Sequence, residues 1–234
     1  AGATNSGMKR VLSASGSPHN VIFVGAGSEE SIQRSEVAET AAGIAEAAVP
    51  GIHESLGVRA VSNEIHYMNF ADLEGGVRKQ AMFRGVTAQA LRVHPEVRVS
   101  EGTFPSAGQV MVGRLAWRKL GVSEADLKPG KSIGLDGQQL QISGTFAAPG
   151  TVLESEIWAT LGDLRVLSKR ETVSCVVLRL DNPEDFSEAD LFAKQRLDLE
   201  LSALRESDYY AHLSSFFKPL RAMTRMASGG RDVQ

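Results

Sequence analysis

The chain opens with a segment of helical spacing. Residues 5–15 place Met8, Val11 and Leu12 on one face of a helix, with polar residues between them. Gly16 and Pro18 then end this helix, because glycine readily adopts the left-handed conformation that follows a helix and proline cannot continue one. The pattern predicts a short amphipathic helix near the N-terminal end.

An extended segment, a helix and a second extended segment come next. Residues 20–24 form a continuous apolar run that predicts a buried strand, and residues 25–34 form a polar loop. Apolar residues return at helical spacing over 35–48, and residues 58–70 are extended again. This order predicts a strand–helix–strand unit.

The middle of the chain, residues 82–147, is rich in short extended segments separated by glycine and proline. Asp136 and Gly137 separate two of these segments, at 132–135 and 138–142. This pair favours a type I′ hairpin turn, because both central residues of that turn need positive φ. A short helix over residues 113–120 is predicted to interrupt the strands.

Helices and strands alternate again in the last third of the chain. Residues 172–180 predict a buried strand around Cys175, and residues 186–199 predict a helix with Ser187 and Asp190 as its capping box. The same string, SEADL, also occurs at 123–127, where a proline two residues later limits a helix to about one turn.

A final amphipathic helix is predicted to include Tyr209 and the residues that follow it, and it becomes basic towards its end. Aromatic and basic residues are typical of membrane interfaces, whereas the same stripe also suits a helix that packs on a protein core. Both interpretations stay open on the residues alone. The apolar stripe consists of Tyr209, Tyr210, Leu213, Phe216, Phe217, Leu220 and Met223.

Composition excludes some classes of function. The net charge is −3 and the basic residues are scattered, so nothing indicates nucleic acid as a partner. No run approaches the ~20 apolar residues that a membrane helix needs, and no signal peptide is evident. The chain begins at Ala1, which is consistent with a piece of a longer protein. Its single cysteine, Cys175, cannot form a disulfide within the chain and leaves the compartment open.

No group of residues predicts catalysis, a cofactor or a metal. Residues 25–27 (GAG) follow a strand as in nucleotide-binding loops, but Glu29 and Glu30 would repel a phosphate. The five histidines lack the spacing of metal ligands, and no serine lies in a Gly-x-Ser-x-Gly elbow. Trp117 and Trp158 are predicted to be packing residues.

Short motifs occur in a characteristic order along residues 5–226. They are NSGMK at 5–9, FRGV at 83–86, VSEGTF at 99–104, VMVGRLA at 110–116, PGKSI at 129–133, ISGTF at 142–146, SEIW at 155–158 and ESDYY at 206–210, with Leu164 and Arg170 between the last two. In this order they resemble the periplasmic core domain of MacB- and FtsX-type ABC transporter permeases. Thr103, Gln109 and Lys131 depart from the usual residues of that family.

The resemblance implies an α+β fold with a discontinuous, porter-like α/β subdomain built from residues 17–70 and 172–207. A β-rich, Sabre-like subdomain, residues 71–171, would be inserted between these segments. Residues 1–16 and 208–234 would be membrane-proximal helices that lead to transmembrane helices, the second followed by a tail.

The resemblance further implies a noncatalytic, periplasmic domain of an inner-membrane protein. Its partners would be an ABC ATPase domain or subunit, a second permease in a homodimer or heterodimer, and a periplasmic adaptor or carrier protein. ATP binding and hydrolysis would move the domain through the membrane helices and drive substrate efflux or lipoprotein release. The residues expected to couple the domain to the membrane are Met8, Val11, Leu12, Tyr209, Tyr210, Leu213, Phe216, Phe217 and Leu220.

Two other functions stay open. A free-standing periplasmic binding or carrier module would have no membrane segments beside it. An enzyme could assemble its active site from distant residues such as His66 or His94, and loss of turnover on a single histidine substitution would indicate it.

Overall fold

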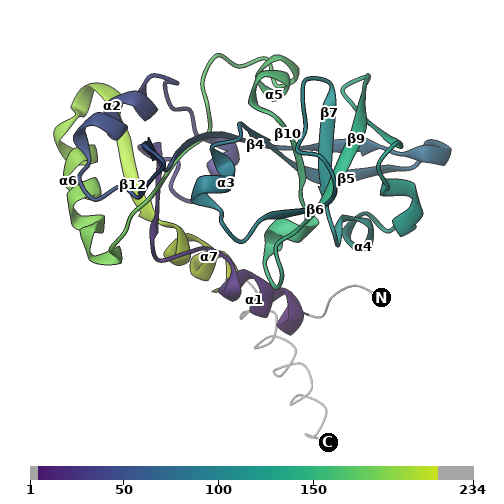
Figure 1. The fold of residues 1–234 in the computed structure, drawn as a ribbon, viewed down its shortest axis with the longest axis horizontal. Coiled ribbons are helices and arrows are strands. Elements are labelled where there is room, and N and C mark those ends of the chain that lie inside the picture. Colours follow the sequence, from purple (N-terminus) through teal and green to yellow (C-terminus); the bar gives the residue numbers. More distant parts are fainter. Residues whose placement is uncertain (1–4, 216–234) are drawn as a thin grey trace, which may run out of the picture.

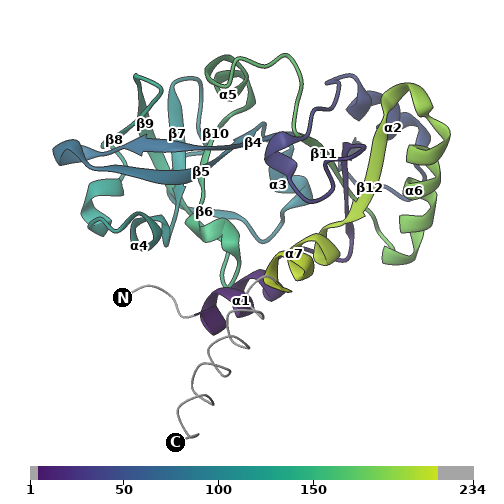
Figure 2. The same cartoon turned by 180° about the vertical axis from the view of Figure 1, so that it is seen from behind.

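Two groups of strands lie side by side in the computed structural model of the chain, with helices α1 and α7 along one side of them (Figure 1). The structure describes residues 5–215. Helix α1 (Asn5–Ala14) and helix α7 (Glu206–Ser215) lie next to each other in both views (Figure 1 and Figure 2). The predicted mixture of helices and strands is confirmed, as is the predicted N-terminal helix.

The first group of strands is antiparallel and has the order β12-β1-β11-β4. Helix α2 lies between β1 and β4 in the chain, and helix α6 lies between β11 and β12. Each helix therefore connects two parallel strands that have an antiparallel strand between them, a doubled split β-α-β arrangement. The elements are β1 (Asn20–Gly25), α2 (Ala41–Ala48), β4 (Val61–Asp72), β11 (Cys175–Arg179), α6 (Phe186–Gln195) and β12 (Leu201–Arg205).

Both faces of this first group are covered, which explains its continuous apolar strands. Phe23 of β1 packs against Phe192 of α6, with ring centroids 5.6 Å apart. Ile22 and Val24, on the opposite face of β1, pack instead with residues of α1 and α7. Neighbouring side chains of a strand point to opposite faces. The strand predicted over residues 20–24 is confirmed and is buried along its whole length.

The second group of strands closes into a barrel-like ring. The ring runs β4-β5-β10-β7-β9-β8, and β8 returns to β4 through the pair of Asp72 with Gly134. Strand β6 pairs with the second half of β9. The added elements are β5 (Arg78–Val86), β6 (Arg98–Gly102), β7 (Gln109–Gly113), β8 (Ser132–Leu135), β9 (Gln138–Ala147) and β10 (Ile157–Thr160).

Strand β4 belongs to both groups and changes partner along its length. Its residues 61–64 pair with β11, and its residues 65–72 pair with β5. The first group therefore passes into the second at Glu64 and Ile65.

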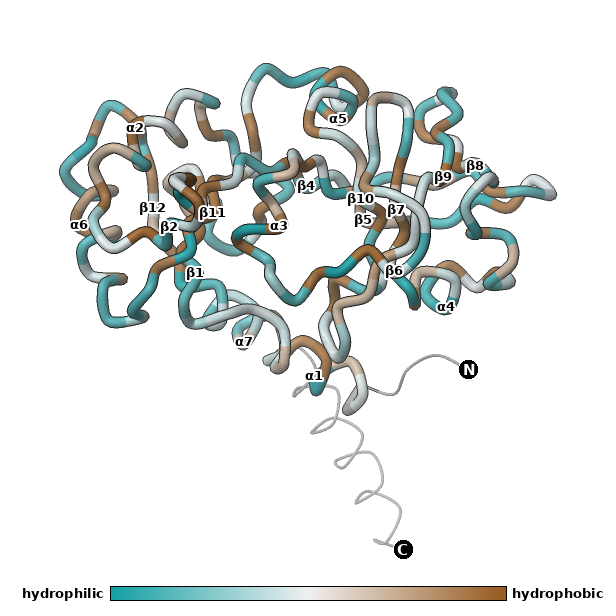
Figure 3. Tube along the Cα trace, in the orientation of Figure 1, coloured by the Kyte–Doolittle hydropathy of each residue, from teal (hydrophilic) through white to brown (hydrophobic). Residues whose placement is uncertain are grey.

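The remaining elements are short. Figure 3 shows hydrophobic positions along the central strands and hydrophilic ones along many outer turns.

Among the described residues, no helix has the length and apolar character required to cross a membrane. The short elements are β2 (Glu54–Ser55), β3 (Val58–Arg59), α3 (Ala90–Val93), α4 (Ala116–Leu120) and α5 (Leu161–Leu167).

Local sequence signals succeed and fail in different places. The predicted hairpin is confirmed, since Asp136 and Gly137 have φ values of 50° and 81° between β8 and β9. The helix predicted over residues 35–48 is too long, because it begins only at Ala41. Val37 instead forms an isolated β-bridge with Val173 and is buried. Pairing with a distant segment therefore overrides the helical spacing at its start.

The capping box predicted at Ser187 and Asp190 is wrong. Helix α6 begins at Phe186, so Ser187 already lies inside it. The other copy of the string does form a capping box, between Ser123 and Asp126, at the start of a short 3₁₀ helix.

Candidate functional site

The two terminal helices bring together most of the described residues that were predicted to couple the domain to a membrane. Met8 and Leu12 of α1 lie in one apolar cluster with Tyr209, Tyr210 and Leu213 of α7. The two tyrosine rings meet edge to face, with centroids 5.3 Å apart. The cluster packs on the face of β1 and β11 opposite to helix α6. In the described part of the chain, the tyrosine stripe therefore faces the protein core.

The other predicted coupling residues are placed differently. Val11 is half-buried outside this cluster, and its carbonyl oxygen accepts a hydrogen bond from Ser15. Phe216, Phe217 and Leu220 lie outside the described residues.

The end of α1 meets the start of α7 at Gly16. This residue has φ +83°, and a Cβ atom built on it would lie 2.7 Å from the carbonyl oxygen of Glu206 and 2.8 Å from the ring of Tyr210. Only glycine fits this close approach. Beside it, the Ser15 hydroxyl accepts a hydrogen bond of 2.9 Å from the backbone N–H of Val152, in the short 3₁₀ helix before β10. The helix pair thus contacts both groups of strands.

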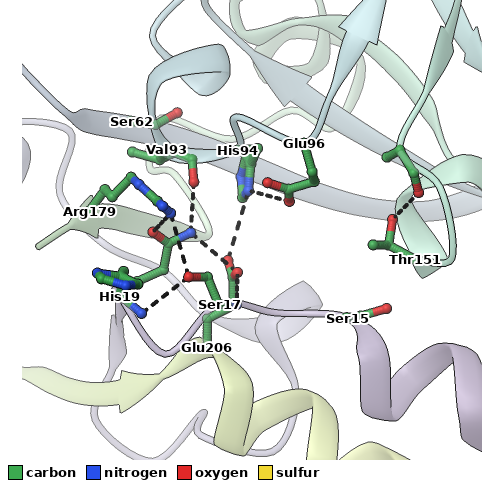
Figure 4. A network of polar contacts seen from close by, with 12 residues as sticks. Ser15, Ser17, His19, Ser62, Val93, His94, Glu96, Thr151, Arg179 and Glu206 are labelled. Carbon is green, nitrogen blue, oxygen red and sulfur yellow. Dashed lines mark hydrogen bonds and ion pairs between the residues drawn. The ribbon is translucent and has the colours of Figure 1, made fainter. Parts of the chain in front are cut away.

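Glu206, the first residue of α7, holds the segment that connects α1 to β1 (Figure 4). Its Oε1 accepts hydrogen bonds from the backbone N–H of Ser17 at 2.9 Å and from the Asn20 side chain at 3.2 Å. The Asn20 amide also donates to the carbonyl oxygen of Val93 at 2.8 Å. A carboxylate at a helix N-terminus is favoured by the helix dipole. Burial nevertheless raises the pKa of Glu206 above its ordinary value.

His94 lies between this helix start and strand β4. Its Nε2 is 2.9 Å from Oε2 of Glu64. Its Nδ1 is 3.9 Å from a carboxylate oxygen of Glu206 and equally far from one of Glu96 (Figure 4). Burial alone would lower the pKa of His94, but the carboxylate of Glu64 raises it to about 9. The side chain is therefore a buried imidazolium at neutral pH.

Arg84 of β5 extends these contacts into the ring of strands. Its guanidinium forms two hydrogen bonds with Glu156, at 2.8 and 3.0 Å, and one of 2.7 Å with Glu64. The same group lies 3.4 Å from the hydroxyl of Tyr210. Glu156 also accepts a hydrogen bond from the indole of Trp158, which is fully buried as predicted. Arginine suits this role because its planar fork matches a carboxylate.

These side chains form one set of alternating charges, which we call the buried ionic network: Glu64, Arg84, His94, Glu156 and Glu206. All five are buried. The network lies where β4 changes partner, so it contacts both groups of strands and the first turn of α7. Its members come from five separate segments of the chain, and its geometry depends on all of them.

Three residues that could bind a metal ion lie in or beside the network, but the guanidinium of Arg84 already occupies the position that the ion would take. Ligand atoms of Glu64, His66 and Cys175 lie within 4.8 Å of one another. Arg84 donates to Glu64 and, at 2.9 Å, to Nε2 of His66. Burial and the nearby Arg84 lower the pKa of His66 well below its ordinary value, and burial raises the pKa of the Cys175 thiol. The donor set therefore fits a guanidinium better than a metal ion.

The network is separate from a surface cavity at the barrel end where β4 meets β8. That cavity has a volume of about 290 Å³, and its lining includes Asp72, Lys131 and Ser132. The network itself is enclosed by protein. Its charged groups are directed at one another. The network can therefore hold β4, β5 and the start of α7 in fixed relative positions.

Sequence reasoning named some of these residues but not the network. It rejects His66 and His94 as metal ligands on their spacing and otherwise names them only as candidates for an enzyme, and it names Arg84 only as part of a motif. A signal was present at Arg84, which interrupts the apolar run 81–86, whereas Glu64 lies among other polar residues of its strand. A charged residue at a buried strand position implies a partner of opposite charge.

Known proteins resemble this chain in sequence pattern and in fold. The family model of the MacB-like periplasmic core domain matches residues 2–190. The crystal structure of the periplasmic region of MacB from Actinobacillus actinomycetemcomitans has a TM-score of 0.59 at 10% identity. The similarity covers 81% of this chain and 89% of that one. A comparison with curated proteins finds no match.

A second solved structure has the same fold. The extracellular domain of the noncanonic ABC-type transporter YknZ from Gram-positive bacteria has a TM-score of 0.59 at 12% identity, over 79% of this chain and 99% of that one. At these identities the structures show the fold alone, whereas the family model covers most of the sequence. The chain belongs to the family of MacB-like periplasmic core domains, which are extracytoplasmic domains of ABC-type transporter permeases.

Proposed function

We propose that this domain couples the ATP-driven movement of membrane helices to export or release of a substrate outside the cytoplasm. An ATPase domain or subunit and a membrane environment follow from the family. The observation that carries the proposal is the pairing of α1 with α7, which come from opposite ends of the described chain and pack on each other. Two helices that bracket a domain and contact each other are well placed to receive movement from a membrane.

The same proposal assigns a role to each part of the chain. Residues 1–16 and 208–234 would be the membrane-proximal segments that lead to transmembrane helices. Residues 17–70 together with 172–207 would form the porter-like subdomain, and residues 71–171 the inserted, Sabre-like one. The doubled split β-α-β arrangement and the ring of strands support this division, because the ring lies in the interval between the two halves of the first group.

The proposal also includes the assembly of the transporter. Two permeases would act as a homodimer or heterodimer, and a periplasmic adaptor or carrier protein would accept the substrate. The coupling itself would be mechanical and noncatalytic in this domain, because the buried ionic network is directed inward rather than towards a substrate.

A cross-link between the helices tests the proposal. Met8 and Leu213 belong to the same apolar cluster, and cysteines in their places would join α1 to α7 in the full transporter. The native Cys175 is fully buried and stays unreactive. We expect oxidation to reduce substrate-stimulated ATPase activity at least tenfold and reduction to restore it, with the domain itself still folded.

A matched cross-link serves as the control. Glu54 and Arg59 face each other across the exposed hairpin of β2 and β3, and cysteines there would join two positions that are already held together. This second cross-link should leave the stimulation unchanged. Normal stimulation with α1 joined to α7 would refute the coupling role of the helix pair.

A further inference from the structure

Helix α7 forms two polar contacts, one helical turn apart, in addition to its apolar packing on α1 and β1. Glu206 holds the segment after α1 through Ser17 and Asn20, and Tyr210 approaches Arg84 of β5. Residues four positions apart lie on the same face of a helix. One face of the first turns of α7 therefore contacts both the start of β1 and the ring of strands.

His94 is the part of the network that joins these two contacts. It forms a direct contact with Glu64 on β4. It also faces Glu206 on α7 at 3.9 Å (Figure 4), so it lies between the sheet and the helix. The other carboxylate near it, Glu96, is more exposed than either of these. A displacement of the start of α7 would separate Glu206 from His94 and would leave the buried carboxylate of Glu206 without an opposite charge, whereas His94 would keep its contact with Glu64.

We propose that the charge contact between Glu206 and His94, called the latch below, holds the start of α7 and the end of α1 against β4. Movement of the helix pair would strain or break this contact and would in this way act on both groups of strands. The inference rests on the proposed coupling function and names the residues through which it acts. Glu206 and His94 are positioning residues in this description, and neither touches a substrate.

Local amide exchange in the isolated chain tests the latch directly. Glu206→Gln keeps an acceptor for Ser17 and removes the charge that faces His94. We expect hydrogen–deuterium exchange over residues 15–20 and 206–215 to become at least tenfold faster, with β5 and β7 unchanged. Asp208→Asn is the matched control, because Asp208 lies in the same helical turn with its side chain 80% exposed. That control should exchange as the wild type does.

A second and a third variant separate the latch from a general loss of stability. His94→Gln should loosen the same two segments, and the double variant should exceed the larger single effect by less than threefold, since both changes break one contact. Tyr210→Phe removes only the hydroxyl and should speed exchange within α7 alone. If Glu206→Gln does not fold, His94→Gln and Tyr210→Phe still carry the test.

Two results would overturn the latch: wild-type exchange in the loosened segments, or a rise spread evenly over all strands. The full transporter then separates this inference from the proposed function. Loosened exchange with normal substrate-stimulated ATPase activity would retain the latch and remove its coupling role. Wild-type exchange with impaired stimulation would remove the latch and leave the helix pair as the coupling element.

Discussion

The hairpin of β4 and β5 carries two arginine–carboxylate pairs in contrasting surroundings. Near its tip, Arg78 and Asp72 approach to 2.7 Å with both side chains in contact with solvent. Near its base, Arg84 and Glu64 also approach to 2.7 Å, but their side chains are 3% and 0% exposed. Distance is the same in both pairs, so the surroundings decide what each contributes. Water can solvate either member of the outer pair, whereas the inner pair depends on its protein partners.

Removal of each arginine should give the largest difference between the two pairs. Arg84→Met would leave Glu64 and Glu156 buried without their shared cation, and breaking a buried pair in this way typically costs about 3–5 kcal/mol. We expect a large decrease in the urea midpoint of unfolding, measured by circular dichroism. Arg78→Met on the same strand is the control and should leave the midpoint unchanged. Equal effects of the two substitutions would contradict the comparison.

The pH dependence of stability should separate a buried histidine from an exposed one. The pKa of His94 in the folded protein, about 9, lies above the value of ~6.5 expected in the unfolded chain. Its stabilising effect is therefore fully present below pH ~6.5 and is lost as the pH rises through about 9. Each tenfold difference in proton affinity between the folded and unfolded states corresponds to ~1.4 kcal/mol, so the loss amounts to about 3 kcal/mol.

The measurement is the free energy of unfolding in urea between pH 6 and pH 10, for the wild type and for His94→Gln. The difference between them should shrink as the pH rises. His53 provides the control, because it contacts Asp181 at 2.7 Å while about half of its side chain is exposed. His53→Gln should follow the wild-type profile, and a parallel profile for His94→Gln would show that His94 is not the group responsible.

Two glycines provide the same kind of comparison for packing, because one is closely surrounded by other atoms and the other is not. A Cβ atom on Gly113, at the end of β7, would lie 2.2 Å from the backbone carbonyl oxygen of Glu154. Gly113→Ala should therefore destabilise the fold by about 1–3 kcal/mol through overpacking. Gly43 in α2 has open space around it, and Gly43→Ala should stabilise the helix by about 0.5–1 kcal/mol. Thermal unfolding of both variants would reveal the opposite signs, and shifts of the same sign would refute the argument.

The features that could be predicted from the sequence are those that neighbouring residues determine, whereas features that depend on distant partners could not be predicted. The hairpin turn at Asp136 and Gly137 was predictable because two adjacent residues specify it. The buried position of Cys175 was predictable from its apolar neighbours. The network was not predictable, because members such as Arg84 and Glu156 are separated by 72 positions and meet only after the domain has folded. The sequence predicted the apolar faces of α1 and α7. It could not predict that these faces would pack on β1 and β11, because that depends on the assembled sheet.

The two SEADL strings provide the smallest test of how surroundings alter one sequence. Ser123 begins its helix, and its hydroxyl accepts a hydrogen bond of 3.2 Å from the N–H of Ala125. Ser187 lies inside α6, where its hydroxyl is 3.5 Å from the carbonyl oxygen of Glu184. Ser123→Ala should therefore cost ~1 kcal/mol, the usual value of an N-cap, and Ser187→Ala should change stability far less.

Urea unfolding of the two alanine variants would measure this difference. The substitution and the four residues that follow it are the same, so the unfolded chains should change by nearly equal amounts. A cost at Ser123 alone would show that the position of the helix start, set by the fold around each string, determines whether a serine caps it. Equal costs would mean that the string carries its stabilising effect by itself, and the contrast between the two sites would then have no energetic meaning.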